Sequence, residues 1–272
     1  ANWHRMRESK EILDRTFELF AAAEKRVHAD SVYGKRLAAL GDYLARLKKK
    51  GVKVEKKLAR KGVPEFQLAE TDDAIRIDGR FDEPVWQNIP AERRGRLKEI
   101  TSGDDPAFAT YFKAAWGKEN IYFAIRCEDK AEDTVNIGTD RDEDPAVWYG
   151  DLVEILLESD KQSYYQIAVS PAGAVVDLDR STGQIFKWNS QAEAATQIGK
   201  DYWTIEIRIP VVETTNDPYH QVVGEKPTEA SPWYFNICRQ RMRGNDRQYS
   251  TFSPTGERSF HVIEKFAKLY CE

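Results

Sequence analysis

Residues 146–179 read AVWYGDLVEILLESDKQSYYQIAVSPAGAVVDLD, and this stretch decides the fold. In the run 152–157 the apolar residues occupy both alternating sets of positions, which predicts a strand that is covered on both faces. The runs 163–170 and 174–178 are also strand-like, and Pro-Ala-Gly at 171–173 predicts the turn between them. We therefore expect a three-stranded antiparallel meander.

A single acid, Glu154, interrupts the first of these apolar runs. A carboxylate among covered apolar residues is costly unless it is hydrogen-bonded. Glu154 therefore needs a fixed protein partner or a polar ligand, and both explanations stay open. The aromatic pair Trp148 and Tyr149 precedes the run and predicts an aromatic rim beside it.

Further strand patterns extend from this centre to both sides. Strands are expected at 75–77, 108–116, 121–128, 202–209, 233–240 and 266–271. A short helix is expected at 82–86, with Trp86 packed inward. The whole pattern predicts a mainly β fold, an antiparallel β-sandwich of jelly-roll type.

The first part of the chain has a different pattern. Two apolar stripes at helical spacing predict an N-terminal α-helical hairpin or arm over residues 1–62. A linker over 63–73 and the sandwich over 74–272 follow. Because the chain begins at Ala1 without Met, we expect the hairpin to be the end of a preceding domain, with a plain linker arm as the alternative.

Composition limits the classes of partner. With 41 basic and 45 acidic residues the net charge is -4, which argues against nucleic acid. No run of eighteen apolar residues occurs, which argues against a membrane span. Cys127, Cys238 and Cys271 lack the CxxC spacing of zinc sites. Their odd number weighs against a disulfide scaffold, although one bridge remains open.

Seven motifs together resemble carbohydrate-binding module family 9 and the DOMON-like sandwich domains around it. They are IDGRFDEPVW (77–86), AAWGKENIYFAIRCED (114–129), WYGDLVEILL (148–157), YYQIAVSPAGAVVD (164–177), DYWTIEIRIP (201–210), WYFNICRQR (233–241) and SFHVIEKFAKLY (259–270). The resemblance implies a module that binds a glycan end without catalysis. It also implies an extracellular or periplasmic location and a larger polysaccharide-degrading protein, with a catalytic domain upstream.

The resemblance also implies a site. Its residues would be Trp148, Glu154, Phe260, Gln166, Arg239 and Arg241. Two aromatic plates would stack on the apolar faces of a sugar ring, and charged groups would bind its hydroxyls. The sequence departs from the family at Ala168 and Cys238, where Arg239 and Arg241 are the nearby substitutes. For Arg239 a structural ion pair with Glu154 is the simpler reading, and Phe260 is equally a plate or a packing anchor.

An acidic loop raises the question of calcium. Asp140, Asp142 and Asp144 alternate at a spacing that hard oxygen ligands use, but Pro145 stands where a helix-loop-helix calcium loop needs Gly. A solvated loop is the simpler interpretation. Structural calcium is implied by the resemblance alone.

The residues give less support to other functions. A glycosidase would need a second acid converging on Glu154, and no loop presents one. We therefore expect no catalysis in this chain. A structural interaction module with a decayed sugar site remains an alternative. The other is a haem-binding DOMON-like domain, which would have to use Met242 with His261 or His220.

Overall fold

A computed structural model describes residues 18–28, 31, 37–38, 41, 60, 62–131, 133–160, 164–180, 187–215 and 220–271. The chain divides into two compact units, Ala1–Lys61 and Gly62–Glu272. In the first unit residues 18–24 are helical, and the Phe20 ring lies 2.9 Å from the position of a Cβ at Gly41. Most of the hairpin predicted over 1–62 lies outside the described residues.

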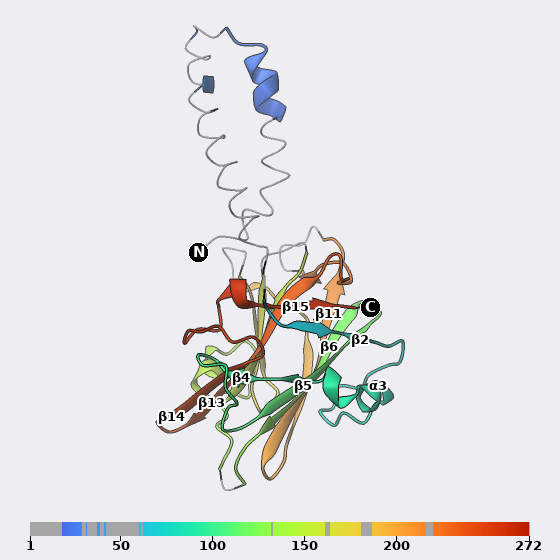
Figure 1. Ribbon diagram of the computed structural model, residues 1–272, viewed down its shortest axis with the longest axis vertical. Coiled ribbons are helices and arrows are strands. Elements are labelled where there is room, and N and C mark those ends of the chain that lie inside the picture. Colours follow the sequence, from blue (N-terminus) through green and yellow to red (C-terminus); the bar gives the residue numbers. More distant parts are fainter. Residues whose placement is uncertain are drawn as a thin grey trace. The chain divides into compact units, whose positions relative to one another are not determined.

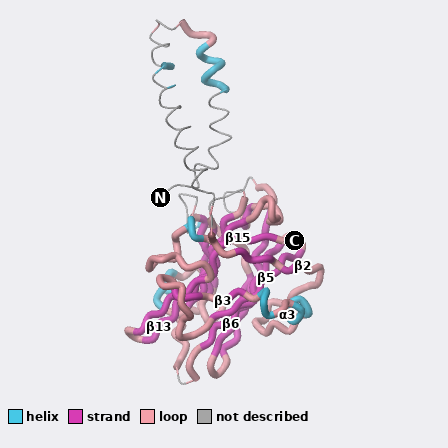
Figure 2. The backbone as a smooth tube through the Cα atoms, viewed as in Figure 1, coloured by secondary structure: helices cyan, strands magenta, loops and turns pink. Residues whose placement is uncertain are grey.

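The second unit is built almost entirely from strands and loops (Figure 2). Its first sheet has the order β1 (Glu65–Gln67), β15 (Ala267–Tyr270), β13 (Trp233–Arg243), β7 (Leu152–Glu158), β8 (Tyr165–Val169) and β9 (Val175–Asp179). Two further strands join it, β14 (Asp246–Thr251) beside β13 and β4 (Lys98–Glu99) beside β14. The predicted meander is confirmed as β7, β8 and β9, paired antiparallel.

The second sheet has the order β10 (Glu193–Ile198), β11 (Tyr202–Val212), β6 (Asn120–Glu128), β5 (Thr110–Gly117) and β2 (Ala69–Glu70) (Figure 1). β12 (Val222–Val223) pairs with β11, and β3 (Gly95–Arg96) pairs with β5. The short helices are α3 (Pro84–Asn88), η2 (Ala91–Arg93), η3 (Pro145–Tyr149) and η5 (Ile263–Lys265).

The main core lies between the two sheets. It is formed by the inward residues of each strand, such as Ile155 and Phe235 from the first sheet and Phe123 and Ile205 from the second, all fully buried. Burial of side chains on this scale supplies the main driving force for the fold. The predicted β-sandwich is therefore confirmed.

The outer face of the first sheet is covered as well, as the apolar run 152–157 predicts. Leu152 packs with Val147 and half-buried Trp148, and Leu156 packs with Tyr164 and Phe266. This cover comes from loops and short 3-10 helices rather than from a third sheet. Glu154 lies on β7 between these two clusters and is itself buried.

The outer face of the second sheet carries the segment that includes α3. Glu206 on β11 is buried and holds this segment: its carboxylate accepts hydrogen bonds from Trp86 Nε1 (2.7 Å) and from the backbone N–H groups of Asp78 and Gly79 (both 3.0 Å). The inward packing predicted for Trp86 is thus confirmed.

The structure differs from the sequence prediction at the start of this unit. The predicted linker over 63–73 contains β1 and β2, which pair in parallel with β15 and β5. A third parallel pair joins β11 and β12, so the sheets are mixed rather than purely antiparallel. The strand predicted at 75–77 does not form. No helix within the described residues is long and apolar enough to cross a membrane.

Candidate functional site

Glu154 lies at the centre of β7 and faces outward from the first sheet. The register places it opposite Cys238 of β13 on one side and Ala168 of β8 on the other. Its side chain is nevertheless buried. Ala168 and Cys238, two positions at which the sequence is expected to depart from the resembled family, are therefore the small neighbours of Glu154 on the adjacent strands.

A chain of hydrogen bonds satisfies this buried acid. Trp148 Nε1 donates to Glu154 Oε1 (3.1 Å), and Gln166 Nε2 donates to Glu154 Oε2 (2.9 Å). Arg180 then donates to Gln166 Oε1 from Nε (2.7 Å) and from Nη2. Glu154 thus has the protein partners that its burial requires, and the guanidinium of Arg180 lies at the end of this chain of hydrogen bonds.

Burial raises the pKa of Glu154 to about 7. The hydrogen bond from Trp148, the positive charge of Arg180 and the hydrogen bond from Gln166 act against this shift. The group can therefore accept hydrogen bonds as a carboxylate in neutral solution, although its environment favours the protonated form more than water does.

Tyr164 and His261 lie next to this chain of hydrogen bonds. The Tyr164 hydroxyl and His261 Nδ1 are 3.0 Å apart, and burial raises the pKa of Tyr164 to about 12. Sequence reasoning did not select Tyr164 or Arg180. The signal was available in the strand period, because Tyr164 shares a face with Gln166, and Arg180 continues the outward face of β9.

The two predicted aromatic plates differ in exposure. Trp148 lies on η3, which begins with Pro145 and is capped by Asp144 through a bond from Ala146 N (2.9 Å). Its indole is half-buried. Phe260 is only 9% exposed and packs edge-on against Tyr249, with ring centroids 5.9 Å apart. Phe260 therefore has the contacts of a packing anchor.

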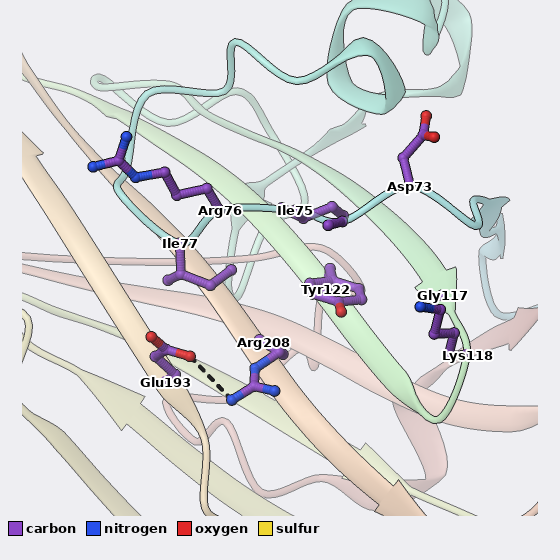
Figure 3. A pocket seen from close by; sticks show the side chains of 10 residues that line it. Asp73, Ile75, Arg76, Ile77, Gly117, Lys118, Tyr122, Glu193 and Arg208 are labelled. Carbon is purple, nitrogen blue, oxygen red and sulfur yellow. Dashed lines mark hydrogen bonds and ion pairs between the residues drawn. The ribbon is translucent and has the colours of Figure 1, made fainter.

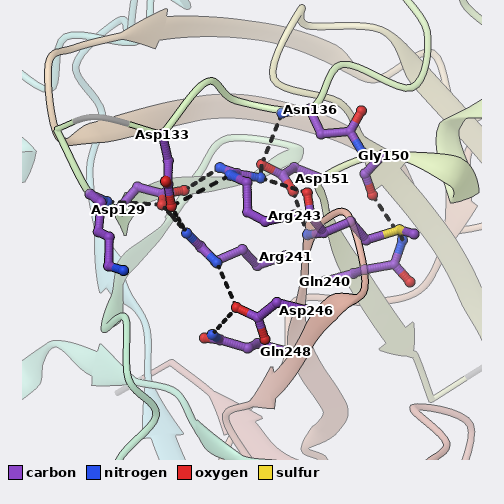
Figure 4. A network of polar contacts seen from close by, with 12 residues as sticks. Asp129, Asp133, Asn136, Gly150, Asp151, Gln240, Arg241, Arg243, Asp246 and Gln248 are labelled. Carbon is purple, nitrogen blue, oxygen red and sulfur yellow. Dashed lines mark hydrogen bonds and ion pairs between the residues drawn. The ribbon is translucent and has the colours of Figure 1, made fainter.

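The other two predicted residues, Arg239 and Arg241, lie elsewhere. Arg239 is opposite Val153, so it faces the side of the sheet away from Glu154. It donates to the Glu128 carbonyl (2.8 Å) and contacts Asp129 (3.4 Å). Arg241 binds Asp129 and other acids at the end of β13 (Figure 4). The predicted ion pair between Arg239 and Glu154 does not form, so that prediction is wrong.

The acidic loop does not bring its three aspartates together. Asp144 caps η3 and pairs with Arg141 (2.6 Å), Asp142 accepts from Val175 N (2.8 Å), and Asp140 is exposed. Among the described residues no group of three or more His, Cys, Asp or Glu side chains is arranged to hold a metal ion. Structural calcium remains a prediction from the resemblance.

The candidate haem ligands have protein partners instead. Met242 Sδ accepts from Gln240 Nε2 (3.1 Å), His261 bonds Tyr164, and His220 Nδ1 lies 2.5 Å from the Gln221 carbonyl. This arrangement does not fit a Met–His haem site. The three cysteines are buried and free, so the disulfide left open by the sequence does not form.

Two packed sheets with a polar cluster buried under an outer face have the architecture of a β-sandwich protein. The sequence profile described as carbohydrate family 9 binding domain-like matches residues 77–260. Because this match covers more than half of the chain, the chain belongs to that family. Such modules bind carbohydrate and are non-catalytic. A search of curated proteins finds no match.

Solved structures share the fold. A candidate carbohydrate-binding protein from Bacteroides uniformis ATCC 8492 superposes with a TM-score of 0.60 at 15% identity, over 78% of this chain and 100% of its own. A family 9 module from Caldicellulosiruptor kristjanssonii in complex with cellotriose gives 0.52 at 14% identity, over 76% and 94%. Its complex with glucose gives 0.51 at 14% identity, over 76% and 95%.

Proposed function

We propose that this chain binds the end of a glycan on the outer face of the first sheet, beside Glu154. The strongest support for this proposal is the series of hydrogen bonds that runs from Trp148 through Glu154 and Gln166 to Arg180. Carboxylate and guanidinium groups each bind two neighbouring hydroxyls, and an indole matches the C–H face of a sugar ring.

The biological role would be passive. As part of a larger secreted or periplasmic polysaccharide-degrading protein, the module would hold a linked catalytic domain near its substrate and raise the local concentration. One stacked indole contributes on the order of 1 kcal/mol, so a single module should bind weakly. The complexes of the Caldicellulosiruptor module make glucose and cellotriose the first ligands to test.

The test is calorimetric titration of the full chain with these sugars and a wider panel of oligosaccharides. We expect saturable binding that is lost in Trp148→Ala and in Glu154→Ala and weakened at least tenfold, roughly one charge-assisted hydrogen bond, in Arg180→Ala. Ile198→Ala is the control, because this exposed apolar side chain lies on the other sheet. Titrations with calcium and with a chelator test the predicted ion.

A second candidate is a structural interaction module with a decayed sugar site. Two observations favour it: Phe260 is packed rather than open, and the residues directly opposite Glu154 on the neighbouring strands, Ala168 and Cys238, supply no charged or amide group for a ligand. Absence of heat with every ligand, from folded and calcium-loaded protein, would support this candidate. A Soret band in the purified protein would instead support the haem-binding alternative.

A further inference from the structure

A hollow lies on the outer face of the second sheet, away from the hydrogen-bond chain around Glu154. Its volume is about 360 Å³. Outward side chains of β5 and β6 form its base, and Arg94 and Phe81 complete its wall. At this volume it falls within the size range of small-molecule sites and accommodates about one ring-sized ligand.

The strand register brings two cations together in this hollow. Gly95 of β3 lies opposite Phe112 of β5, at a contact so close that a Cβ at Gly95 would collide with the Phe112 ring. Arg94 directly precedes β3, both Arg94 and Lys113 line the hollow, and the charge of Arg94 acts on Lys113. Like charges held this close together disfavour each other.

No acid in the described part of the chain compensates this pair. The Lys113 ammonium donates to the Trp86 carbonyl, and neither Lys113 nor Arg94 forms an ion pair with a described residue. Glu128, the acid that lines the hollow, is already paired with Arg126 (2.7 Å). Burial lowers the pKa of Lys113, and the charge of Arg94 lowers it further. An anion in the hollow would relieve both effects.

Apart from the paired Arg126 and Glu128, the rest of the wall is apolar and partly aromatic. Ala124 lies opposite Lys113 on β6, and its small side chain leaves space beside the ammonium group. Tyr111 on β5 is 37% exposed. Phe81 has a φ of 61°, a costly conformation for a bulky residue, and Gln87 Nε2 holds its carbonyl (2.7 Å). These surfaces suit the flat face of a ring.

The neighbouring pocket on the same sheet face lacks this imbalance. It has a volume of about 540 Å³, and Figure 3 shows Glu193 and Arg208 paired within it. Their charged groups are 3.0 Å apart, and Arg76 pairs with Asp78 at 3.7 Å. Most charged side chains of the larger pocket are therefore in ion pairs, whereas, in the part of the chain that the structure describes, Arg94 and Lys113 of the smaller hollow are not.

We propose that the hollow between Arg94, Lys113 and Tyr111 is a second binding site, which takes a carboxylate carried on a ring, such as a uronic acid unit of a glycan. Arg94 and Lys113 would bind the carboxylate from two sides. Tyr111 and Phe81 would contact the ring. This site is independent of the one proposed around Glu154.

The experiment is calorimetric titration of the full chain with D-glucuronate, benzoate, D-glucose and acetate at low salt. Binding by either ring acid, at least about tenfold tighter than by acetate, is expected. Glucuronate distinguishes a sugar acid from an aromatic acid, for which benzoate stands. Arg94→Ala and Lys113→Gln should each weaken this binding about tenfold. Lys118→Gln, which removes the same charge beside the larger pocket, should leave it unchanged.

A Trp148→Ala background separates this site from the other one. Glucuronate binding that persists in Trp148→Ala but is weakened in Arg94→Ala supports the proposal. Binding that Trp148→Ala abolishes and Arg94→Ala leaves intact would place the ligand at Glu154 and overturn it. Equal affinities for acetate and the ring acids, equal losses in Lys118→Gln, or no binding of any acid would also overturn it. Arg94 is exposed, so its variant should fold.

Discussion

At the scale of single residues, the position of Glu154 combines two demands. Burial between Cys238 and Ala168 disfavours its charge, while Trp148 and Gln166 direct donors at both of its oxygens. A buried acid of this kind costs stability at neutral pH. Sites that must accept hydrogen bonds from a ligand often contain such costly groups.

The cost of Glu154 gives a pH prediction. Its pKa is about 7 in the folded chain against an ordinary 4.5, so folding favours the protonated form. Its contribution to the free energy of unfolding is therefore full below about pH 4.5 and is lost as the pH rises through about 7. Between pH 5 and pH 8 Glu154→Gln should gain roughly 2 kcal/mol relative to the unmodified chain.

Urea unfolding at the two pH values measures this difference. The comparison cancels any constant cost that the amide causes by disturbing Gln166, because that cost is the same at both pH values. Glu119→Gln, in an exposed turn, is the control and should show no such trend. A difference for Glu154→Gln that stays flat or falls with pH would contradict the prediction.

At the scale of elements, β13 shows what the sequence could and could not reveal. Its strand character followed from alternation, and the acid of β7 was recognised as out of place. The pairing register was not accessible, and a shift of one residue moves a side chain to the other face of a sheet. Cys238 therefore faces Glu154, while Arg239, its neighbour, faces away. Arg180 was not selected because the predicted strand ended at Leu178, although the alternation continues to Arg180.

The same strand carries a buried ion cluster. Asp129 is 3% exposed at its side chain and pairs with Arg239, Arg241 and Arg243 at 3.4, 2.7 and 2.5 Å. Although burial opposes its ionisation, the hydrogen bond from Arg241 lowers the pKa of Asp129. The acid thus joins β13 to the end of β6.

Asp129→Asn should destabilise the fold by about 3–5 kcal/mol at pH 7, because buried Arg239 loses the one acid that it contacts among the described residues, while Arg241 and Arg243 keep other acid partners. Because folding lowers the pKa of Asp129, its contribution is present above the ordinary value of 3.8 and lost as the pH falls below it. The penalty should therefore shrink in acid. Asp246→Asn, whose side chain is 57% exposed, should cost less than about 1 kcal/mol. Equal losses in chemical denaturation would refute the assignment.

At the scale of the whole molecule, short strands decide where the sandwich begins. β1 and β2 have three and two residues, too few for a periodic signal, and they pair with strands far along the chain. That is why the sequence predicted a linker there. Long apolar strands such as β7 and β11 were predictable because their alternation extends over many residues.

This boundary gives a truncation prediction. A chain of residues 62–272 should unfold cooperatively, since it forms one compact unit. A chain of residues 72–272 removes Phe66 and Leu68, 6% and 1% exposed, from the core. Loss of large core side chains costs about 2–5 kcal/mol each, so this shorter chain should melt much lower or fail to fold. Equal melting temperatures by circular dichroism would show that β1 and β2 are dispensable.

The parallel pairing of β1 with β15 also has a mechanical consequence. Glu65 lies beside Lys268 and Gln67 beside Tyr270. Because the two strands run parallel, the N-terminal end of β1 and the C-terminal end of β15 lie at opposite ends of the pair. Tension applied to Gly62 and Cys271 would load this pair in shear, and its bonds would have to rupture together rather than unzip one by one. The resistance to such a pull is set by the unfolding rate rather than by equilibrium stability.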